Sequence, residues 1–218
     1  MRMTGVTFNN YYGSLLIFNL VIFLFTHAVV MISAYAFKVS SLYIPPAFAT
    51  YSLFFIVVGP GLLMFTACVS FIFDRSESAK QYFSSMISIM ILSSYMPTAI
   101  VEMIVPESPA GSILNYVFTI ILPFYLPPGI MWQLSKIYIK CSLLDTCDSM
   151  SSSDYCTPEI ITMYVMAIVN IPMYYMLLRI LDAKKNGGSF RKALFLKVRL
   201  YLDFMEYCKL LNSFLELY

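Results

Sequence analysis

The sequence predicts an all-α integral membrane protein with about four transmembrane helices and one re-entrant hairpin. Of its 218 residues, 60% are hydrophobic and only 12% are charged. The mean hydropathy is +0.76, and such a composition is far more apolar than that of an average soluble domain. Several long stretches have no charged side chain, and the longest runs from Val39 to Phe73. Because about 20 apolar residues cross a bilayer as a helix, these stretches predict membrane spans.

The transmembrane domain is expected to cover residues 12–178. Its four spans are predicted at about 12–37, 47–73, 82–105 and 160–178. A short N-terminal segment of residues 1–11, which we expect to be cytoplasmic, precedes the first span, and its only charged side chain is that of Arg2. The apolar stretch after it is longer than the hydrophobic region of a signal peptide, so we expect a first transmembrane helix rather than a cleaved leader.

Three of the predicted spans contain an internal proline, namely Pro60, Pro97 and Pro172. A proline inside a helix removes one backbone donor, and in a membrane the neighbouring helices satisfy the freed carbonyl group. These three prolines are therefore candidate hinges.

Residues 113–134 are apolar, but their middle holds Pro123, Pro127, Pro128 and Gly129, which no straight helix accommodates. The segment is either a broken fifth span or a re-entrant hairpin. With the hairpin, eleven of the fourteen Lys and Arg residues are cytoplasmic and three are outside, whereas a full span places five inside and nine outside. Positive charges accumulate on the cytoplasmic side. This rule favours the hairpin, with both termini cytoplasmic.

The same topology makes residues 135–159 an outer loop, which contains Cys141, Cys147 and Cys156. Disulfides form on this side of a membrane. Cys147 and Cys156 enclose a polar run and are the pair that we expect to be bonded. The alternative is that all three thiols are free, and one cysteine is left over in either case.

Residues 179–218 are expected to form a cytoplasmic tail, which carries eight of the fourteen Lys and Arg residues. Between Arg191 and Glu216, apolar residues recur at helical spacing on one side, with charged residues on the other. Such a helix either lies on the membrane surface, near anionic head groups, or packs against a soluble domain or partner.

Polar residues within membrane spans are costly and often functional. Asn19 and His27 are eight residues apart, on roughly the same helical face, and we expect His27 to form an interhelical hydrogen bond. A role in proton transfer is the alternative. Glu102 is the only carboxylate close to a span, near its outer end, where it either reaches water or contacts an ion or substrate.

Composition and motifs argue against several kinds of chemistry. The chain has one His, no CxxC pair and no GxxxxGK[ST] loop. We therefore predict no catalytic, metal-binding or cofactor-binding residue in this chain. Its net charge of +2 is too small to predict a nucleic-acid partner.

Two segments resemble the membrane domain of A-subfamily ATP-binding cassette (ABC) transporters. The run Ser70–Phe73, followed by a polar turn that ends at Ala79, is similar to a conserved corner of that family, and Gly59-Pro60 lies where the family has a proline feature. The run Ile121–Ile130 looks like the family's proline-rich hairpin segment, although Pro128 stands where the family has an arginine. The resemblance covers roughly Tyr11 to Lys185.

The resemblance implies a partial type-2 exporter membrane domain, with a hairpin that dips into the outer leaflet. It also implies lipid translocation driven by ATP and Mg²⁺, which bind at nucleotide-binding domains that this chain lacks. Its partners would be membrane lipids, those nucleotide-binding domains and the other membrane half-domain. The chain alone would then be a fragment of a lipid transporter, inactive without its motor.

Two other hypotheses stay open. A free-standing four-helix membrane adaptor would suit the amphipathic tail and the cysteine-containing loop. A small channel would usually place charged rings or ordered polar residues along a pore, and the spans offer little beyond His27 and a few asparagines.

Overall fold

The computed structural model describes residues 8–73, 76–104, 109–144, 147 and 151–185. The chain divides into two compact units, Met1–Tyr174 and Tyr175–Tyr218. All helices and the hairpin discussed below belong to the first unit, except the end of the last helix. The predicted amphipathic helix after Arg191 lies outside the described residues.

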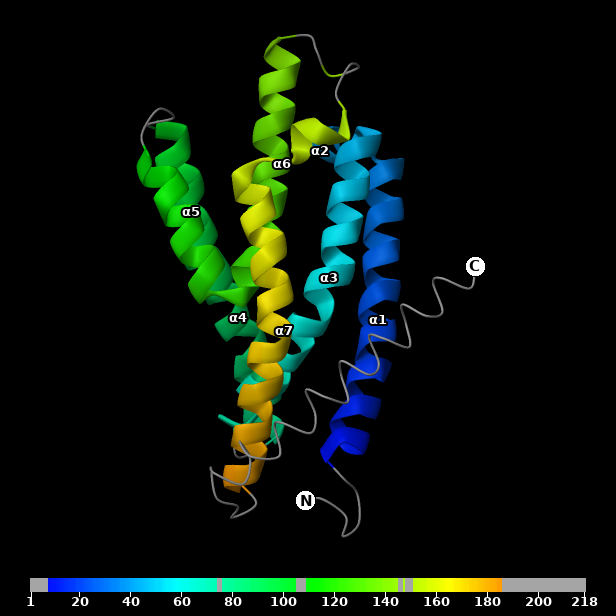
Figure 1. The fold of residues 1–218 in the computed structure, drawn as a ribbon, viewed down its shortest axis with the longest axis vertical. Helices are drawn as coiled ribbons and strands as arrows, with labels where there is room; N and C mark the ends of the chain where they lie inside the picture. Colours follow the sequence, from blue (N-terminus) through cyan, green and yellow to red (C-terminus); the bar gives the residue numbers. More distant parts are fainter. Residues whose placement is uncertain (1–7, 74–75, 105–108, 145–146, 148–150, 186–218) are drawn as a thin grey trace. The chain divides into compact units, whose positions relative to one another are not determined.

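Among the described residues, four long helices are apolar enough to cross a membrane, as many as the predicted spans. They are α1 (Phe8–Ala36), α3 (Pro45–Ser70), α4 (Ser76–Ile104) and α7 (Pro158–Lys185), and the short α2 (Ser40–Tyr43) joins α1 to α3 (Figure 1). Each has 26 to 29 residues, or about 40 Å at 1.5 Å per residue, against a hydrocarbon core of about 30 Å. The helices start up to six residues before the predicted spans, because polar residues at their ends also adopt helical conformation.

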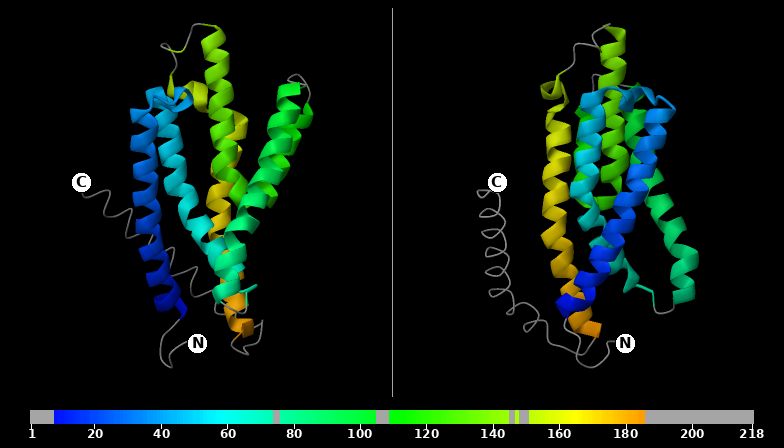
Figure 2. Two further views of the ribbon diagram at one scale, coloured as in Figure 1. Left: turned by 180° about the vertical axis from the view of Figure 1, so that it is seen from behind. Right: turned by 90° about the vertical axis from the view of Figure 1, so that its right-hand side faces the viewer.

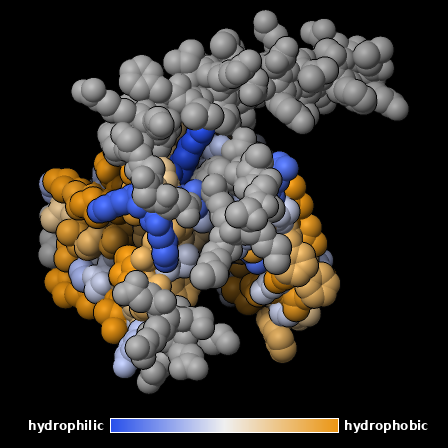
Figure 3. All heavy atoms as spheres, turned by 90° about the horizontal axis from the view of Figure 1, so that it is seen from below, coloured by the Kyte–Doolittle hydropathy of each residue, from blue (hydrophilic) through white to orange (hydrophobic). Residues whose placement is uncertain are grey.

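Large apolar side chains point outward from these helices. Phe18 is 65% exposed and Phe25 is 71% exposed, both on α1. Figure 3 shows apolar residues, in orange, along the outer sides of the helices. Soluble proteins rarely expose so large an apolar surface, whereas in a bilayer lipid chains would cover it.

Two glycines beside Pro60 let α3 approach its neighbours. A Cβ atom at Gly59 would lie 2.8 Å from Cε1 of Phe23 on α1, and one at Gly61 would lie 3.5 Å from Cβ of Asn170 on α7. Small residues allow such close approach between membrane helices. Pro60 lies inside α3, which changes direction partway along its length (Figure 2). Hinge motion at Pro60, Pro97 or Pro172 stays a prediction, since all three lie inside continuous helices.

Between α4 and α7 the chain forms a helical hairpin. It consists of α5 (Pro109–Ile121), the 3-10 helix η1 (Pro123–Tyr125) and α6 (Leu126–Leu143). Figures 1 and 2 show that the chain reverses at η1, so that the far ends of α5 and α6 lie toward the same end of the unit. With 13 residues, α5 is about 20 Å long, too short to cross a bilayer. The placement of this hairpin in a membrane stays a prediction.

The break in the hairpin involves fewer residues than predicted, because Pro127, Pro128 and Gly129 all lie within α6. The helical path is interrupted only around Leu122, whose backbone is extended, and at η1, which begins with Pro123. Pro127 and Pro128 lie instead in the first turn of α6, where a missing N–H costs no hydrogen bond. Within the predicted outer loop of 135–159, α6 continues to Leu143, and the position of this loop relative to a membrane stays a prediction.

Candidate functional site

A row of polar and small residues lines the contact between α4 and α5. We call it the polar seam, and its members are Ser94, Thr98 and Glu102 on α4 and Gly111, Asn115 and Thr119 on α5. Within each helix the members are four residues apart, so they share one face. The hydroxyl and amide side chains are almost fully buried, with exposures of 0–1%.

The register of the seam follows from one close contact. A Cβ atom at Gly111 would overlap Cγ of Glu102, so these two residues face each other. Since α5 runs back along α4, steps of four residues then place Asn115 level with Thr98, and Thr119 level with Ser94 (Figure 1). The seam therefore extends from Glu102, near the end of α4, toward the middle of that helix.

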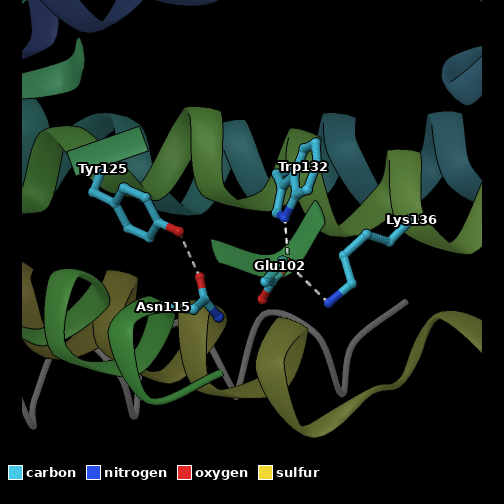
Figure 4. A network of polar contacts seen from close by, with 5 residues as sticks. All are labelled: Glu102, Asn115, Tyr125, Trp132 and Lys136. Atoms are coloured by element: carbon cyan, nitrogen blue, oxygen red, sulfur yellow. Dashed lines mark hydrogen bonds and ion pairs between the residues drawn. The ribbon is translucent and has the colours of Figure 1, made fainter. Parts of the chain in front are cut away.

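Glu102 joins the seam to α6 (Figure 4). Trp132 Nε1 donates a hydrogen bond to Glu102 Oε2, and Lys136 Nζ lies 3.0 Å from the same oxygen. Trp132 and Lys136 are four residues apart on α6, so both face α4. The side chain of Glu102 is only 8% exposed, whereas that of Lys136 is 40% exposed. The ion pair thus has one buried and one half-exposed partner.

A second hydrogen bond ties the seam to the turn of the hairpin. Tyr125, in η1, is fully buried, and its hydroxyl group donates to Asn115 Oδ1 at 2.7 Å. The reversal at Pro123 brings this tyrosine beside α5. The turn of the hairpin is therefore fixed to α5 by a side-chain hydrogen bond as well as by apolar packing.

Three buried polar atoms of the seam have no hydrogen-bond partner among the described residues. They are Glu102 Oε1, Asn115 Nδ2 and Thr119 Oγ1. Figure 4 shows the free carboxylate oxygen of Glu102 on the side of Asn115. Buried polar atoms are seldom left without a partner. The seam thus offers a carboxylate acceptor, an amide donor and a hydroxyl group that can donate or accept, which suit ordered water or a polar group of a ligand.

The predicted interhelical hydrogen bond of His27 was wrong. Its ring stacks on Phe55 of α3, with centroids 4.2 Å apart and planes 6° apart, and Nε2 is buried without a partner among the described residues. Asn19 also has no hydrogen bond within the described ranges, and it is only partly buried. Aromatic packing, rather than polar contact, therefore explains the position of His27.

The predicted Cys147–Cys156 disulfide was also wrong. Cys147 is bonded to Cys141, and the thiol of Cys156 is free and exposed. The reason is the length of α6, which carries Cys141 in its last turn. This places its Cα atom 5.0 Å from that of Cys147, within the usual range for a disulfide.

The structure thus gathers only part of the predicted site. Glu102 lies in the seam, and Pro123 begins the turn that positions Tyr125. Ser94, Thr98 and Thr119 were not predicted, because single Ser and Thr residues are common in membrane helices; their four-residue spacing was the signal that could have revealed them. Trp132 was also not predicted, and no sequence signal links it to Glu102. Within the described ranges, no three His, Cys, Asp or Glu side chains gather as metal ligands would.

Comparison with known proteins gives no relative for this chain. No known protein family, no curated protein and no solved structure matches it. A functional assignment therefore depends on the polar seam and on the sequence resemblance alone.

Proposed function

We propose that this chain is the membrane-spanning part of an ATP-driven lipid transporter of the A-subfamily ABC type. The polar seam is the observation that carries the proposal. It is a line of buried hydroxyl, amide and carboxyl groups inside an apolar bundle, where α4 packs against the first helix of the hairpin. The resemblance of Ile121–Ile130 to the hairpin segment of those transporters supports the same interpretation.

Lipid translocation is chemically consistent with such a seam. A head group that moves between leaflets loses its water, and burying an unpaired polar or charged group costs several kcal/mol or more. Donors such as Asn115 Nδ2 and Thr119 Oγ1, and the acceptor Glu102 Oε1, would replace part of that hydration. The acyl chains would meanwhile stay against the apolar outer sides of the helices.

The energy for transport would come from ATP and Mg²⁺ bound to nucleotide-binding domains, together with the other membrane half-domain. Motion at Pro60, Pro97 and Pro172 would then alter the spacing between helices. Sequencing of the transcript at both ends tests whether the chain is joined to such a motor. A reading frame that continues into a Walker A motif would support it, and its absence would favour a free-standing adaptor.

The lipid path is tested with two photoreactive phosphatidylcholines in vesicles that contain the protein encoded by the full reading frame, so that any motor domains are present. One carries a diazirine on the head group, and the other carries it at the end of an acyl chain. We expect the head-group probe to label seam residues such as Thr98 and Thr119, and the acyl probe to label the exposed Phe25.

The test variant is Thr119→Val, which keeps the shape of the side chain but removes its hydroxyl group. Labelling of Phe25 is the internal control. The variant should reduce head-group labelling of the seam and leave labelling of Phe25 unchanged. Head-group labelling confined to the ends of the helices would contradict the proposal, whatever the acyl probe labels.

A further inference from the structure

A second polar feature lies away from the seam, where α1 ends and α3 begins. It is a pocket of about 390 Å³, within the size range of small-ligand sites. The pocket is lined by Lys38, Ser40, Tyr43, Ile44, Tyr138, Ser142 and Cys147. These residues come from the α1–α2 turn, from α2 and its junction with α3, from the end of α6, and from the loop after α6.

The lining has the chemistry of an anion site. It combines the ammonium group of Lys38 with four hydroxyl groups, from Ser40, Tyr43, Tyr138 and Ser142, and none of the described lining residues is acidic. Asp145 and Asp148, which flank Cys147 in the chain, lie outside the described residues. Hydroxyl and ammonium groups all donate hydrogen bonds, and those to an ionised oxygen are the strongest. A phosphate group carries several acceptor oxygens and can accept from more than one of these donors at once.

The backbone fixes the position of Lys38. Its φ of 51° lies in the left-handed region, which residues other than glycine seldom adopt. Hydrogen bonds from Lys38 N to Tyr35 O at 3.1 Å and from Val39 N to Ala34 O at 3.0 Å hold this turn. Among the described residues, the ammonium group has no ion-pair partner. The positive charge is therefore placed at the pocket without being neutralised by another described side chain.

The disulfide constrains another part of the lining. Cys147 lines the pocket, and its partner Cys141 precedes the lining residue Ser142 in the chain. The bond ties Cys147 to the last turn of α6, which also carries Ser142. The turn at Lys38 and the disulfide therefore constrain two separate parts of the lining.

We propose that this pocket binds a phosphate group. In the predicted topology it lies at the outer surface of the membrane, within reach of both lipid head groups and soluble phosphate. The site is independent of the polar seam and of lipid transport, because no residue of the seam lines it.

Native mass spectrometry of the chain in a maltoside detergent, which contains no phosphate, tests the proposal. The probes are phosphatidic acid, the diacylglycerol with the same acyl chains, and inorganic phosphate. We expect phosphatidic acid or inorganic phosphate to bind, and diacylglycerol to bind more weakly than phosphatidic acid. Preference for phosphatidic acid over inorganic phosphate would identify a head-group site. Equal binding of these two would identify a site for soluble phosphate.

The decisive variant is Lys38→Gln, which should weaken binding by about tenfold or more, as expected for the loss of one charge-assisted hydrogen bond. Its control is Lys140→Gln, which removes an exposed lysine of α6 that does not line the pocket and should leave binding unchanged. Emission of Trp132 equal to that of the wild type shows that the variant is folded. The proposal is overturned if Lys38→Gln binds like the wild type, or if phosphatidic acid and diacylglycerol bind equally and inorganic phosphate does not bind.

Discussion

The ion pair between Glu102 and Lys136 should respond unequally to removal of its two partners. Lys136→Met leaves a carboxylate whose side chain is 8% exposed with only the Trp132 hydrogen bond. Glu102→Gln leaves an ammonium group that is 40% exposed and can turn to water, while the new amide oxygen can still accept from Trp132. We therefore expect Lys136→Met to destabilise the protein more than Glu102→Gln.

The magnitudes follow from the two exposures. Leaving a buried charge without its partner costs about 3–5 kcal/mol of unfolding free energy. Because the Trp132 hydrogen bond is retained, we expect Lys136→Met to cost about 3 kcal/mol. Losing a pair with a half-exposed partner costs about 1 kcal/mol or less. The difference of about 2 kcal/mol is roughly a 30-fold change in the unfolding equilibrium constant. The double variant should be close to Glu102→Gln alone, because it leaves no unpaired carboxylate.

The assay is equilibrium unfolding by sodium dodecyl sulfate in mixed micelles, followed by tryptophan emission. The chain has one tryptophan, Trp132, and it lies in the network itself, so the signal reports directly on this region. The reasoning is refuted if Lys136→Met is no more destabilising than Glu102→Gln, or if the double variant is the least stable of the three.

Three further outcomes are expected from the packing. Gly129→Ala should destabilise by about 1–3 kcal/mol through overpacking, because its Cβ would lie 2.9 Å from both Met163 Cε and Tyr125 Cε1. Gly13→Ala, with nothing within 4 Å, is its control in the same unfolding assay. His27→Phe should leave stability unchanged or raise it, because it keeps a ring for stacking and removes an unpaired buried nitrogen; a loss above about 1 kcal/mol would indicate a polar partner. Maleimide, with the labelled peptides identified by mass spectrometry, should modify Cys156 without reductant, and Cys141 and Cys147 only after reduction. Labelling of all three cysteines without reductant would contradict the disulfide.

The four long apolar helices could be predicted because their signal is collective. A run of about 20 apolar residues predicts a helix of this kind, and no single side chain is critical to the prediction. Helix ends carry no such signal. Lys136 and Lys140 indicate contact with water but do not stop a helix, so α6 continues past them to Leu143. That extension is also why Cys141, rather than Cys156, reaches Cys147.

The polar seam could not be predicted residue by residue. Ser94 and Thr98 each also bond the carbonyl group of the preceding turn, as Ser and Thr do in many membrane helices. What distinguishes Ser94 and Thr98 is that α5 places Thr119 and Asn115 opposite them. This arrangement depends on the contact of Gly111 with Glu102, which sets the register between the two helices. Sequence spacing within one helix shows a face, but not the face that packs against it.

The topology of four spans and a re-entrant hairpin is tested most directly by thiol labelling in intact cells. In a background with both Cys156→Ser and Cys208→Ser, Lys140→Cys and Lys184→Cys each introduce a cysteine at an exposed position. An impermeant maleimide should label Lys140→Cys from outside, and Lys184→Cys only after permeabilisation. If the hairpin were a fifth span, the two positions would exchange sides. Labelling of Lys184→Cys from outside, with Lys140→Cys protected, would contradict the account.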